Sequence, residues 1–182
     1  MNHIHYLSWL LILSLCPMAC APPGDSTRSG IDRSANTLAT GRELLVMDAA
    51  QFKTWLSEQH GQWGLVDYWA TWCGPCTEKF PLVVELEKRF RDQGLKVAAF
   101  SMDDLEDAKK VEAFLAQHGA EFSAMVRSDK MGEAFESHGI REVPTYRLFD
   151  PAGELIVEFV GEFDLQQLEQ LLSSRLNGAG EK

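Results

Sequence analysis

The chain has 182 residues, of which 45% are apolar, and this length suits one globular domain with tails better than two domains. Its 27 aspartates and glutamates outnumber its 17 lysines and arginines, which gives a formal net charge of -10 at pH 7. This composition argues against a disordered or fibrous protein. The lack of a basic block argues against nucleic acid or an anionic membrane surface as a partner.

Residues 1–20 have the features of an export signal, and they contain no Asp, Glu, Lys or Arg. Residues 6–15 (YLSWLLILSL) form a mostly apolar run that is too short to span a bilayer, which takes roughly 20 residues. The run has the length of the apolar centre of a signal peptide, although only His3 and His5 stand where a cationic start is usual. We therefore expect export, with a short membrane anchor or a misassigned start as the alternatives.

Cys20 is a candidate for lipidation. Residues 17–20 (PMAC) resemble a bacterial lipobox, in which a small residue precedes a cysteine that is lipidated and becomes the new N-terminus. Pro17 departs from that motif, which usually has a branched aliphatic residue at this position. Ordinary cleavage after Ala21 is the alternative, but it would leave Pro22 beside the cut bond, where proline is disfavoured. We prefer lipidation of Cys20, which would anchor the chain to a membrane.

Composition divides the rest of the chain into three parts. Residues 21–42 are rich in Pro, Gly, Ser, Thr and Asn, so they predict a flexible tether, with a simple disordered terminus as the alternative. Residues 43–177 carry the apolar patterns of a folded domain. Residues 178–182 are predicted to be a disordered tail.

The first part of the domain alternates strands and helices. Asp48 is placed to cap a helix, Gly94 closes a longer one, and the apolar run after Gly94 is typical of a strand covered on both faces. We expect strands at residues 44–47, 65–70, 96–102 and 121–126, and helices at 49–56, between 73 and 94, at 105–118 and at 130–138.

The last part of the domain no longer alternates strands and helices. Residues 145–149 and 155–160 flank the turn sequence Asp-Pro-Ala-Gly, which predicts an antiparallel hairpin. Asp164 with Gln167 three residues later resembles a capping box for a final helix. Its inward face is predicted to consist of Leu165, Leu168, Leu171 and Leu172. The whole order of elements predicts an α/β fold in which a mixed central sheet has helices on both faces.

The chemistry is concentrated at residues 73–76 (CGPC), which follow a strand and open a helix. Backbone N–H groups and the helix dipole at that position stabilise an anion, so Cys73 is predicted to be the attacking thiolate. Cys76 lies in the first turn, where it can attack the resulting mixed disulfide and release the product. Pro75 lacks an N–H that the first turn leaves unpaired anyway, and Gly74 leaves the surface open to a partner's backbone.

A C-x-x-C pair is also found in zinc sites, but those need two further Cys or His ligands at suitable spacing. The domain has no other cysteine. Its histidines, His60, His118 and His138, are scattered near predicted helix ends, where we expect solvent-exposed polar side chains. We therefore expect neither a metal site nor a cofactor.

Two segments resemble the thioredoxin family. Residues 66–76 (VDYWATWCGPC) are similar to the thioredoxin active-site region, and residues 139–145 (GIREVPT) are similar to its cis-proline loop. Residues 105–127 are an addition to the minimal thioredoxin, and a helix and strand inserted there resemble the exported, membrane-tethered TlpA-like branch. The resemblance implies a thioredoxin-like fold with this insert.

The resemblance also implies roles for particular residues. Pro144 would be cis and lie against the two cysteines, and the backbone of Val143 would pair with an extended substrate segment as an added strand. Trp72 would form part of the docking surface beside Cys73, together with Gly74 and Pro75. A simple packing role for the Trp72 ring is the alternative.

Asp67 stands in a strand that we expect to be buried, where a solitary charge is costly and tends to become protonated. Similarity to thioredoxins implies that it exchanges a proton with Cys76. An edge-exposed or capping aspartate is the alternative. Two departures bear on the site: Ala99 aligns with a thioredoxin lysine, and Lys79, beside Glu78, stands where many TlpA-like proteins have a glutamate.

The predicted function is thiol-disulfide exchange through Cys73 and Cys76 that reduces disulfides of exported proteins. The Gly-Pro pair matches the reducing thioredoxins, with potentials of about -270 mV, rather than oxidants of the DsbA type near about -120 mV. A reductase outside the cytoplasm needs electrons from a partner, and the resemblance implies a membrane thiol reductase, with apocytochrome c maturation proteins among the clients. A disulfide oxidase or isomerase, a peroxiredoxin and a non-catalytic binding lipoprotein are the alternatives.

Overall fold

The structure is a computed structural model that describes residues 36–37, 43–59, 61–162 and 164–176, all of them within one compact unit, Ile31–Lys182. The expected signal segment 1–20, the lipidation site Cys20 and the tail 178–182 lie outside the described residues, as does His60. Within the described part of the chain, no helix combines the length and the apolar character needed to cross a bilayer.

Among the described residues, seven strands form one mixed sheet in the order β1-β2-β5-β4-β3-β6-β7. Strand β5 pairs parallel with β2 and with β4, and β4 pairs parallel with β3. The other pairs, β1 with β2, β3 with β6 and β6 with β7, are antiparallel. The strands are β1 (Asn36–Thr37), β2 (Glu43–Met47), β3 (Trp63–Trp69), β4 (Leu95–Ser101), β5 (Ser123–Arg127), β6 (Thr145–Phe149) and β7 (Leu155–Val160). The predicted strands and the predicted hairpin are therefore confirmed.

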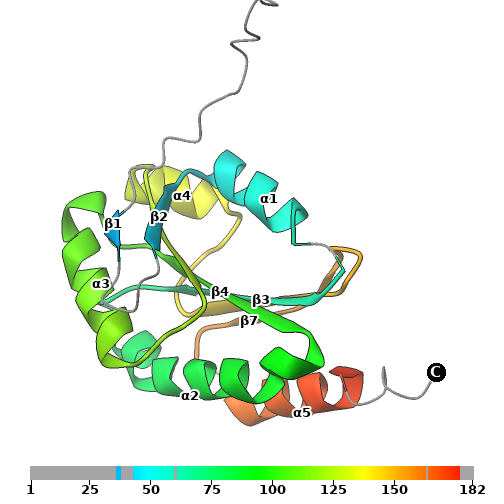
Figure 1. Cartoon of the computed structure of the whole chain (residues 1–182). Coiled ribbons are helices and arrows are strands. Elements are labelled where there is room, and N and C mark those ends of the chain that lie inside the picture. The colour runs from blue at the N-terminus through cyan, green and yellow to red at the C-terminus, as the bar shows by residue number, and fades with distance from the viewer. Residues whose placement is uncertain (1–35, 38–42, 60, 163, 177–182) are drawn as a thin grey trace, which may run out of the picture. The chain divides into compact units, whose positions relative to one another are not determined.

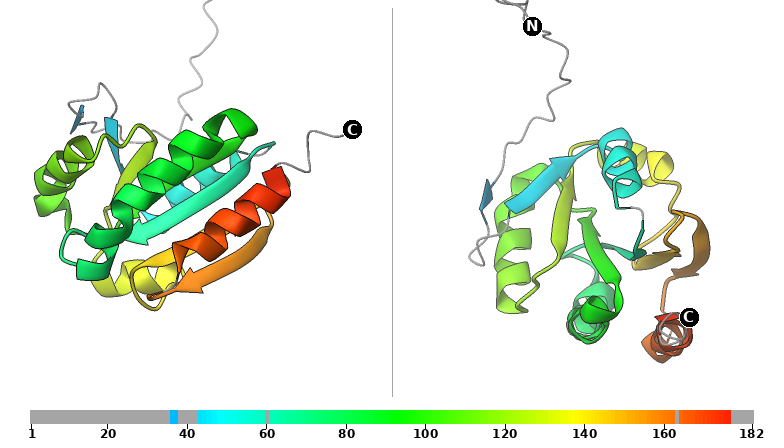
Figure 2. Two further views of the ribbon diagram at one scale, coloured as in Figure 1. Left: turned by 90° about the horizontal axis from the view of Figure 1, so that it is seen from below. Right: turned by 45° about the vertical axis from the view of Figure 1, so that its right-hand side comes forward.

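Five α-helices of the described part of the chain cover the two faces of this sheet (Figure 1). They are α1 (Ala49–Ser57), α2 (Gly74–Phe90), α3 (Ala108–Gln117), α4 (Met131–Ser137) and α5 (Leu165–Leu176), with 3-10 turns at Arg91–Gln93 and Leu105–Asp107. Helices α1 and α4 lie on one face, and α2 and α5 lie on the other, where Figure 2 shows them side by side. The predicted mixed α/β architecture of the thioredoxin type is confirmed.

The insert lies inside the sheet rather than at its margin. The chain leaves β4, forms α3 and returns as β5, which pairs parallel with β4 on one side and with β2 on the other. The apolar strand residues Ala124, Met125 and Val126 are buried there. Since β5 separates β2 from β4, the inserted helix and strand form part of the domain's core.

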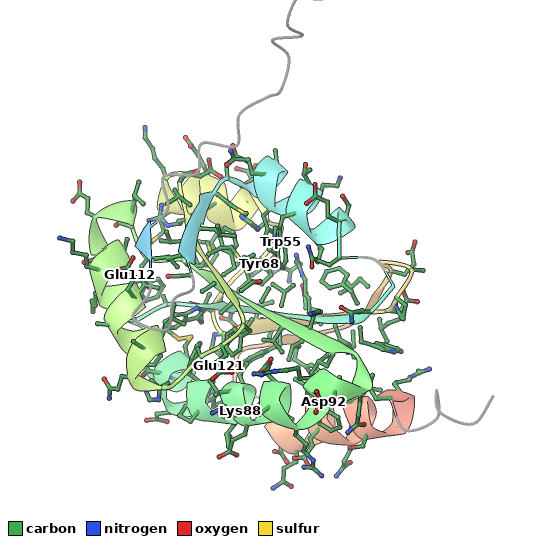
Figure 3. All side chains as sticks on the ribbon, in the orientation of Figure 1. Trp55, Tyr68, Lys88, Asp92, Glu112 and Glu121 are labelled. Carbon is green, nitrogen blue, oxygen red and sulfur yellow. A yellow bond between two sulfur atoms is a disulfide. The ribbon has the colours of Figure 1, made fainter. Side chains whose placement is uncertain are left out.

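The alternation of side chains along β3 builds one core on each face of the sheet. Trp69 points toward α2 and α3, where its ring centroid lies 4.7 Å from that of Phe80 and 4.9 Å from that of Phe114. Tyr68 points the other way, toward α1, where its ring lies 6.0 Å from Phe52. In Figure 3, the labelled Tyr68 lies in the interior beneath α1, while charged side chains such as Lys88 lie on the outer surface of the helices.

The N-terminal cap of α1 is the one predicted from the sequence, whereas the cap of α5 differs from the prediction. The Asp48 carboxylate accepts the N–H of Gln51 at 2.7 Å, and the Gln51 side chain accepts the N–H of Asp48 at 2.9 Å, which is a complete capping box. At α5, the Asp164 carboxylate instead accepts the N–H of Gln166 at 2.9 Å, one residue before the position expected. The predicted inward leucines of α5 are buried, except for Leu171, which is half-buried.

Two expectations need correction. The predicted tether, residues 21–42, includes Asn36–Thr37, which pair with β2 and so extend the sheet by a short edge strand. His138 is not exposed: its ring is buried, with its centroid 4.3 Å from that of Phe100, because the end of α4 turns onto the sheet. Burial lowers the pKa of His138 to about 4. His118 is half-buried, with its ring 4.4 Å from Phe114.

Candidate active site

The sequence places two cysteines where the central strand β3 gives way to helix α2. The carbonyl of Trp69, the last residue of β3, accepts the N–H of Met102 at 2.8 Å, so the end of the strand is fixed to the segment after β4. The N–H of Cys73 then bonds to the carbonyl of Ala70 at 3.2 Å, which forms a tight turn. Cys73 is the N-cap of α2, as the sequence predicted.

Cys73 and Cys76 form a disulfide, with their Cα atoms 5.2 Å apart. The sulfur of Cys73 also accepts the backbone N–H of Cys76 at 3.3 Å, so a donor of the first helical turn points at it. Cys73 is 7% exposed, whereas Cys76 is 1% exposed. The first cysteine is therefore the more accessible of the two from solvent.

The surface around Cys73 is open and partly aromatic. The Trp72 side chain is 49% exposed, and Gly74 is exposed too, while Pro75 is half-buried. No atom would lie within 4 Å of a Cβ added to Gly74, so the space above that residue is empty. A polypeptide segment can therefore approach Cys73 between these residues.

A loop 70 residues further along the chain completes the site. The Val143–Pro144 peptide bond is cis, as expected, and the carbonyl oxygen of Val143 lies 3.6 Å from the sulfur of Cys73. The Pro144 carbonyl accepts the N–H of Gly161 at 2.8 Å, which holds the loop to the end of β7. Pro144 is buried and Val143 is half-buried.

Asp67 lies inside the domain, on the central strand β3, and is 1% exposed. It shares a face with Trp69, whose ring packs against Phe80 of α2, so its carboxyl group lies beneath the helix that carries Cys76. Burial raises the pKa of Asp67 from 3.8 to about 8. Among the described residues, its Oδ1 atom has no hydrogen-bond partner. Asp67 is therefore neither an edge residue nor a helix cap.

The neighbours of Asp67 in the sheet are Ala99 on β4 and Tyr146 on β6. Ala99 was expected from the sequence to leave this aspartate without a lysine, and the register places it directly beside Asp67. Tyr146 is 1% exposed, and its pKa is raised above the ordinary value by burial and by the nearby Asp67 carboxyl. The second neighbour was not identified from the sequence.

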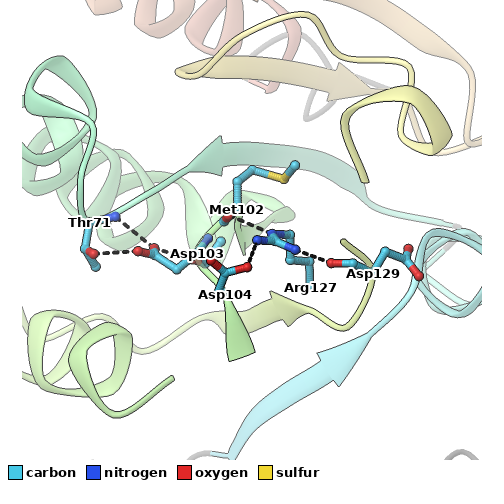
Figure 4. A network of polar contacts seen from close by, with 7 residues as sticks. Thr71, Met102, Asp103, Asp104, Arg127 and Asp129 are labelled. Carbon is cyan, nitrogen blue, oxygen red and sulfur yellow. Dashed lines mark hydrogen bonds and ion pairs between the residues drawn. The ribbon is translucent and has the colours of Figure 1, made fainter. Parts of the chain in front are cut away.

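Sequence reasoning also missed a polar network at this end of the sheet (Figure 4). Because β3, β4 and β5 run parallel, the residues after them meet at one edge, where the buried carboxylate of Asp103 bonds to Thr71. The buried Arg127 donates to the Met102 carbonyl at 2.8 Å, and it also bonds to Asp104 and to the Asp129 carbonyl. An aspartate directly after an apolar strand was the available signal.

Within the described ranges, no group of three His, Cys, Asp or Glu side chains is arranged to hold a metal ion. The chemistry that the site offers is that of the two sulfurs. A disulfide at a helix N-terminus, with an acidic group beneath it and an open surface above it, can exchange its bond with that of another molecule.

Comparison with known proteins also indicates thiol-disulfide chemistry. The profile of the AhpC/TSA family matches residues 41–157. A thiol-disulfide oxidoreductase ResA of Bacillus cereus is 31% identical over 129 residues, which cover 71% of this chain and 72% of that protein. The ResA of Bacillus thuringiensis subsp. konkukian is 29% identical over 156 residues, which cover 84% of this chain and 88% of that protein.

Solved structures resemble the domain as well. The crystal structure of a DsbE-type thiol:disulfide interchange protein from Chlorobium tepidum has a TM-score of 0.59 and 28% sequence identity. The similarity covers 78% of this chain and 92% of that one. Most of that related chain is thus represented here.

Proposed function

This chain belongs to the AhpC/TSA family and is a thiol-disulfide oxidoreductase, and from that premise we propose that it reduces disulfide bonds of exported proteins. The observation that carries the proposal is the Cys73–Cys76 pair: a disulfide at the start of α2, with the more exposed sulfur 3.6 Å from the Val143 carbonyl.

The exchange consumes one client disulfide and produces one enzyme disulfide. In the reduced enzyme, the Cys73 thiolate attacks a client sulfur, which forms a mixed disulfide and releases the client's other sulfur as a thiolate. Cys76 then attacks the sulfur of Cys73, and the client leaves with both its thiols reduced. The enzyme ends as the Cys73–Cys76 disulfide, the state seen in the structure.

The surface around Cys73 supports docking of an extended client segment. Trp72 offers an exposed aromatic face, and Gly74 and Pro75 leave room for a passing backbone. The backbone at Val143 lies close enough to Cys73 to pair with the residues that flank a client cysteine, while buried Pro144 holds that backbone in place. In this proposal Trp72 contacts the client rather than packing internally.

Asp67 serves as the proton acceptor of the second step. Cys76 must lose its proton to attack the mixed disulfide, and it is buried at 1% exposure, away from bulk water. The carboxyl group of Asp67 lies beneath the helix that carries Cys76, and its pKa of about 8 lets it take and return a proton near neutral pH.

The direction and place of the reaction rest on the sequence. The Gly74-Pro75 pair favours a reductase, and residues 1–20 favour export to a bacterial periplasm or cell envelope, with a lipid anchor at Cys20. A reductase in that compartment is recharged by a membrane thiol reductase. Labelled palmitate that reaches the wild type but not a Cys20→Ala variant supports the anchor. Equal or absent labelling of the two contradicts it.

A trapping experiment tests the exchange itself. Cys76→Ser removes the resolving sulfur, so clients accumulate as mixed disulfides on Cys73 and are released by dithiothreitol. The matched control is Cys73→Ser, which leaves Cys76 buried and accumulates none. If Cys76→Ser traps no client, the chain acts as a non-catalytic binding protein. Equilibration with glutathione decides the direction, since a potential near that of DsbA, about -120 mV, makes the protein an oxidase instead.

A further inference from the structure

We propose that Asp103 is a positioning residue for this thiol-disulfide exchange, because its carboxylate fixes the segment that carries Trp72 and Cys73 to the segment that follows β4, just before the insert begins. This inference rests on the proposed function. It concerns how the attacking sulfur is held, which neither the cysteine motif nor the family resemblance addresses.

Asp103 is 0% exposed, and its carboxylate accepts several hydrogen bonds. One carboxylate oxygen accepts the backbone N–H of Thr71 at 2.8 Å and the Ser101 hydroxyl at 2.6 Å. The other oxygen accepts the Thr71 hydroxyl at 2.5 Å. Thr71 thus binds the same carboxylate through both its backbone and its side chain, which sets its position and its orientation together.

Thr71 stands two residues before Cys73, with the half-exposed Trp72 between them. The N–H of Cys73 bonds to the carbonyl of Ala70, the residue just before Thr71. The position of the Cys73 sulfur, 3.3 Å from the Cys76 N–H and 3.6 Å from the Val143 carbonyl, therefore depends on where Thr71 is held. An anchor at Thr71 keeps the sulfur on the helix N-terminus, where a thiolate is stabilised.

Asp103 is itself held in place by a neighbouring side chain and, through Met102, by β5. Its own N–H bonds to the Ser101 side chain at 3.0 Å, and the flanking Met102 carbonyl accepts from Arg127 of β5. Arg127 also bonds to the carbonyl of Asp129 (Figure 4). The carboxylate of Asp129 accepts the N–H of Ala49, at the start of α1, at 3.2 Å. The inserted strand β5 thereby supports the active-site segment through Asp103.

The primary test changes Thr71, because that leaves every charge in place. The rate at which iodoacetamide alkylates Cys73 in the reduced protein is measured against pH. In Thr71→Val, which lacks the hydroxyl, the midpoint of this profile is expected to move up by about half a pH unit, which lowers the alkylation rate below the midpoint roughly threefold. Thr71→Ser keeps the hydroxyl and is expected to match the wild type.

Asp103→Asn separates positioning from a simple charge effect, because the two predict shifts of the alkylation midpoint in opposite directions. Loss of a nearby negative charge alone favours the thiolate and moves the midpoint down. Loss of the anchor moves it up, as in Thr71→Val. Asp104→Asn is the matched control: Asp104 belongs to the same network through Arg127 but bonds that arginine rather than Thr71, so it is expected to leave the midpoint unchanged.

Urea unfolding of each variant distinguishes the remaining outcomes. If Thr71→Val and Asp103→Asn lose stability but keep the wild-type alkylation profile, Asp103 only holds the fold together, and the inference is wrong. A downward midpoint in Asp103→Asn also overturns it. If Asp103→Asn does not fold, the comparison of Thr71→Val with Thr71→Ser tests the inference by itself. Alkylation needs no client, so a failure of the proposed reductase function, seen as no trapping in Cys76→Ser, is distinct from a failure of this inference.

Discussion

Asp67 on β3 stands directly opposite Tyr146 on β6, and each side chain is 1% exposed. Burial raises the pKa of Asp67 to about 8, and the same carboxyl group adds to the rise in the pKa of Tyr146. At neutral pH this pair therefore presents a protonated carboxyl group to the interior, directly below the helix of the two cysteines.

The first prediction concerns the effect of Asp67 on stability. Between pH 4 and pH 8 the folded protein holds a proton on Asp67 that the unfolded chain has lost, since the pKa is about 8 when folded and 3.8 otherwise. The unfolding free energy of the wild type thus falls by about 1.4 kcal/mol per pH unit through this group, and the fall ends above pH 8. Asn cannot take up this proton, so the unfolding free energy of Asp67→Asn lacks this dependence on pH.

Urea unfolding of the wild type and of Asp67→Asn at pH 5, 6, 7 and 8 measures this contribution of Asp67 to the unfolding free energy. The unfolding free energy of Asp67→Asn relative to the wild type is expected to increase steadily over this range. Contributions from the other titrating groups cancel in the difference. A difference that stays constant with pH would show that Asp67 keeps an ordinary pKa.

The second prediction concerns catalysis by Asp67. In insulin reduction driven by dithiothreitol, wild-type turnover is expected to rise with pH toward 8 as Asp67 becomes able to accept the Cys76 proton. Asp67→Asn is expected to lose this rise, and its turnover is expected to fall by about a hundredfold, the low side of what a positioned general base contributes. Glu78→Gln, at an exposed acid on α2, is the control and is expected to keep the wild-type profile.

An unchanged pH dependence in Asp67→Asn removes the proton role. Urea unfolding of Asp67→Asn at the assay pH shows whether slow turnover comes from loss of folded protein.

The third prediction concerns Trp72, which is 49% exposed beside Cys73. Trp72→Ala is expected to raise KM for a protein disulfide about tenfold, equivalent to about 1.4 kcal/mol of lost docking energy. Reaction with the small disulfide DTNB and the urea midpoint are expected to stay near wild type. Leu155→Ala is the control, since Leu155 is 48% exposed but lies on β7. Equal effects on both disulfides would argue for an internal packing role of Trp72.

The fourth prediction concerns acid sensitivity through His138. Its pKa is lowered to about 4, so between pH 6.5 and pH 4 the unfolded chain binds a proton that the folded protein does not. Stability that is present above pH 6.5 is therefore lost as the pH falls, by at most about 1.4 kcal/mol per unit. His138→Phe keeps an aromatic ring against Phe100 but cannot gain a proton.

Unfolding free energies at pH 7.5 and pH 5 check this. The difference between His138→Phe and the wild type is expected to shift in favour of the variant at pH 5. The same difference at both values would mean that His138 titrates alike in the folded and unfolded states.

The order of elements and the position of the cysteines could be read from the sequence because both depend on local patterns. Apolar runs predicted the strands, and the CGPC motif predicted a thiol at a helix N-cap. Burial of Asp67 followed from its place in an apolar strand, and the register confirmed Ala99 as its neighbour.

What the sequence did not reveal depends on contacts between distant elements. His138 was misjudged because a histidine at a helix end looks the same whether that end faces water or the sheet. The bond between Thr71 and Asp103 exists only because β3 and β4 are parallel neighbours with matched ends. The pairing of Asn36–Thr37 with β2 involves too few residues to leave an apolar pattern.

The position of β5 also sets the order in which a growing polypeptide can assemble. Leu44 is made early, yet its parallel neighbour in the sheet is Ala124, so β2 has no such partner until the ribosome has passed β5. The edge of β2 that pairs with β5 must therefore stay unpaired until β5 is made, which leaves the apolar residues of β2 prone to aggregate or to bind chaperones. Nascent chains stalled before residue 123 should expose them, and those stalled well beyond residue 127 should not.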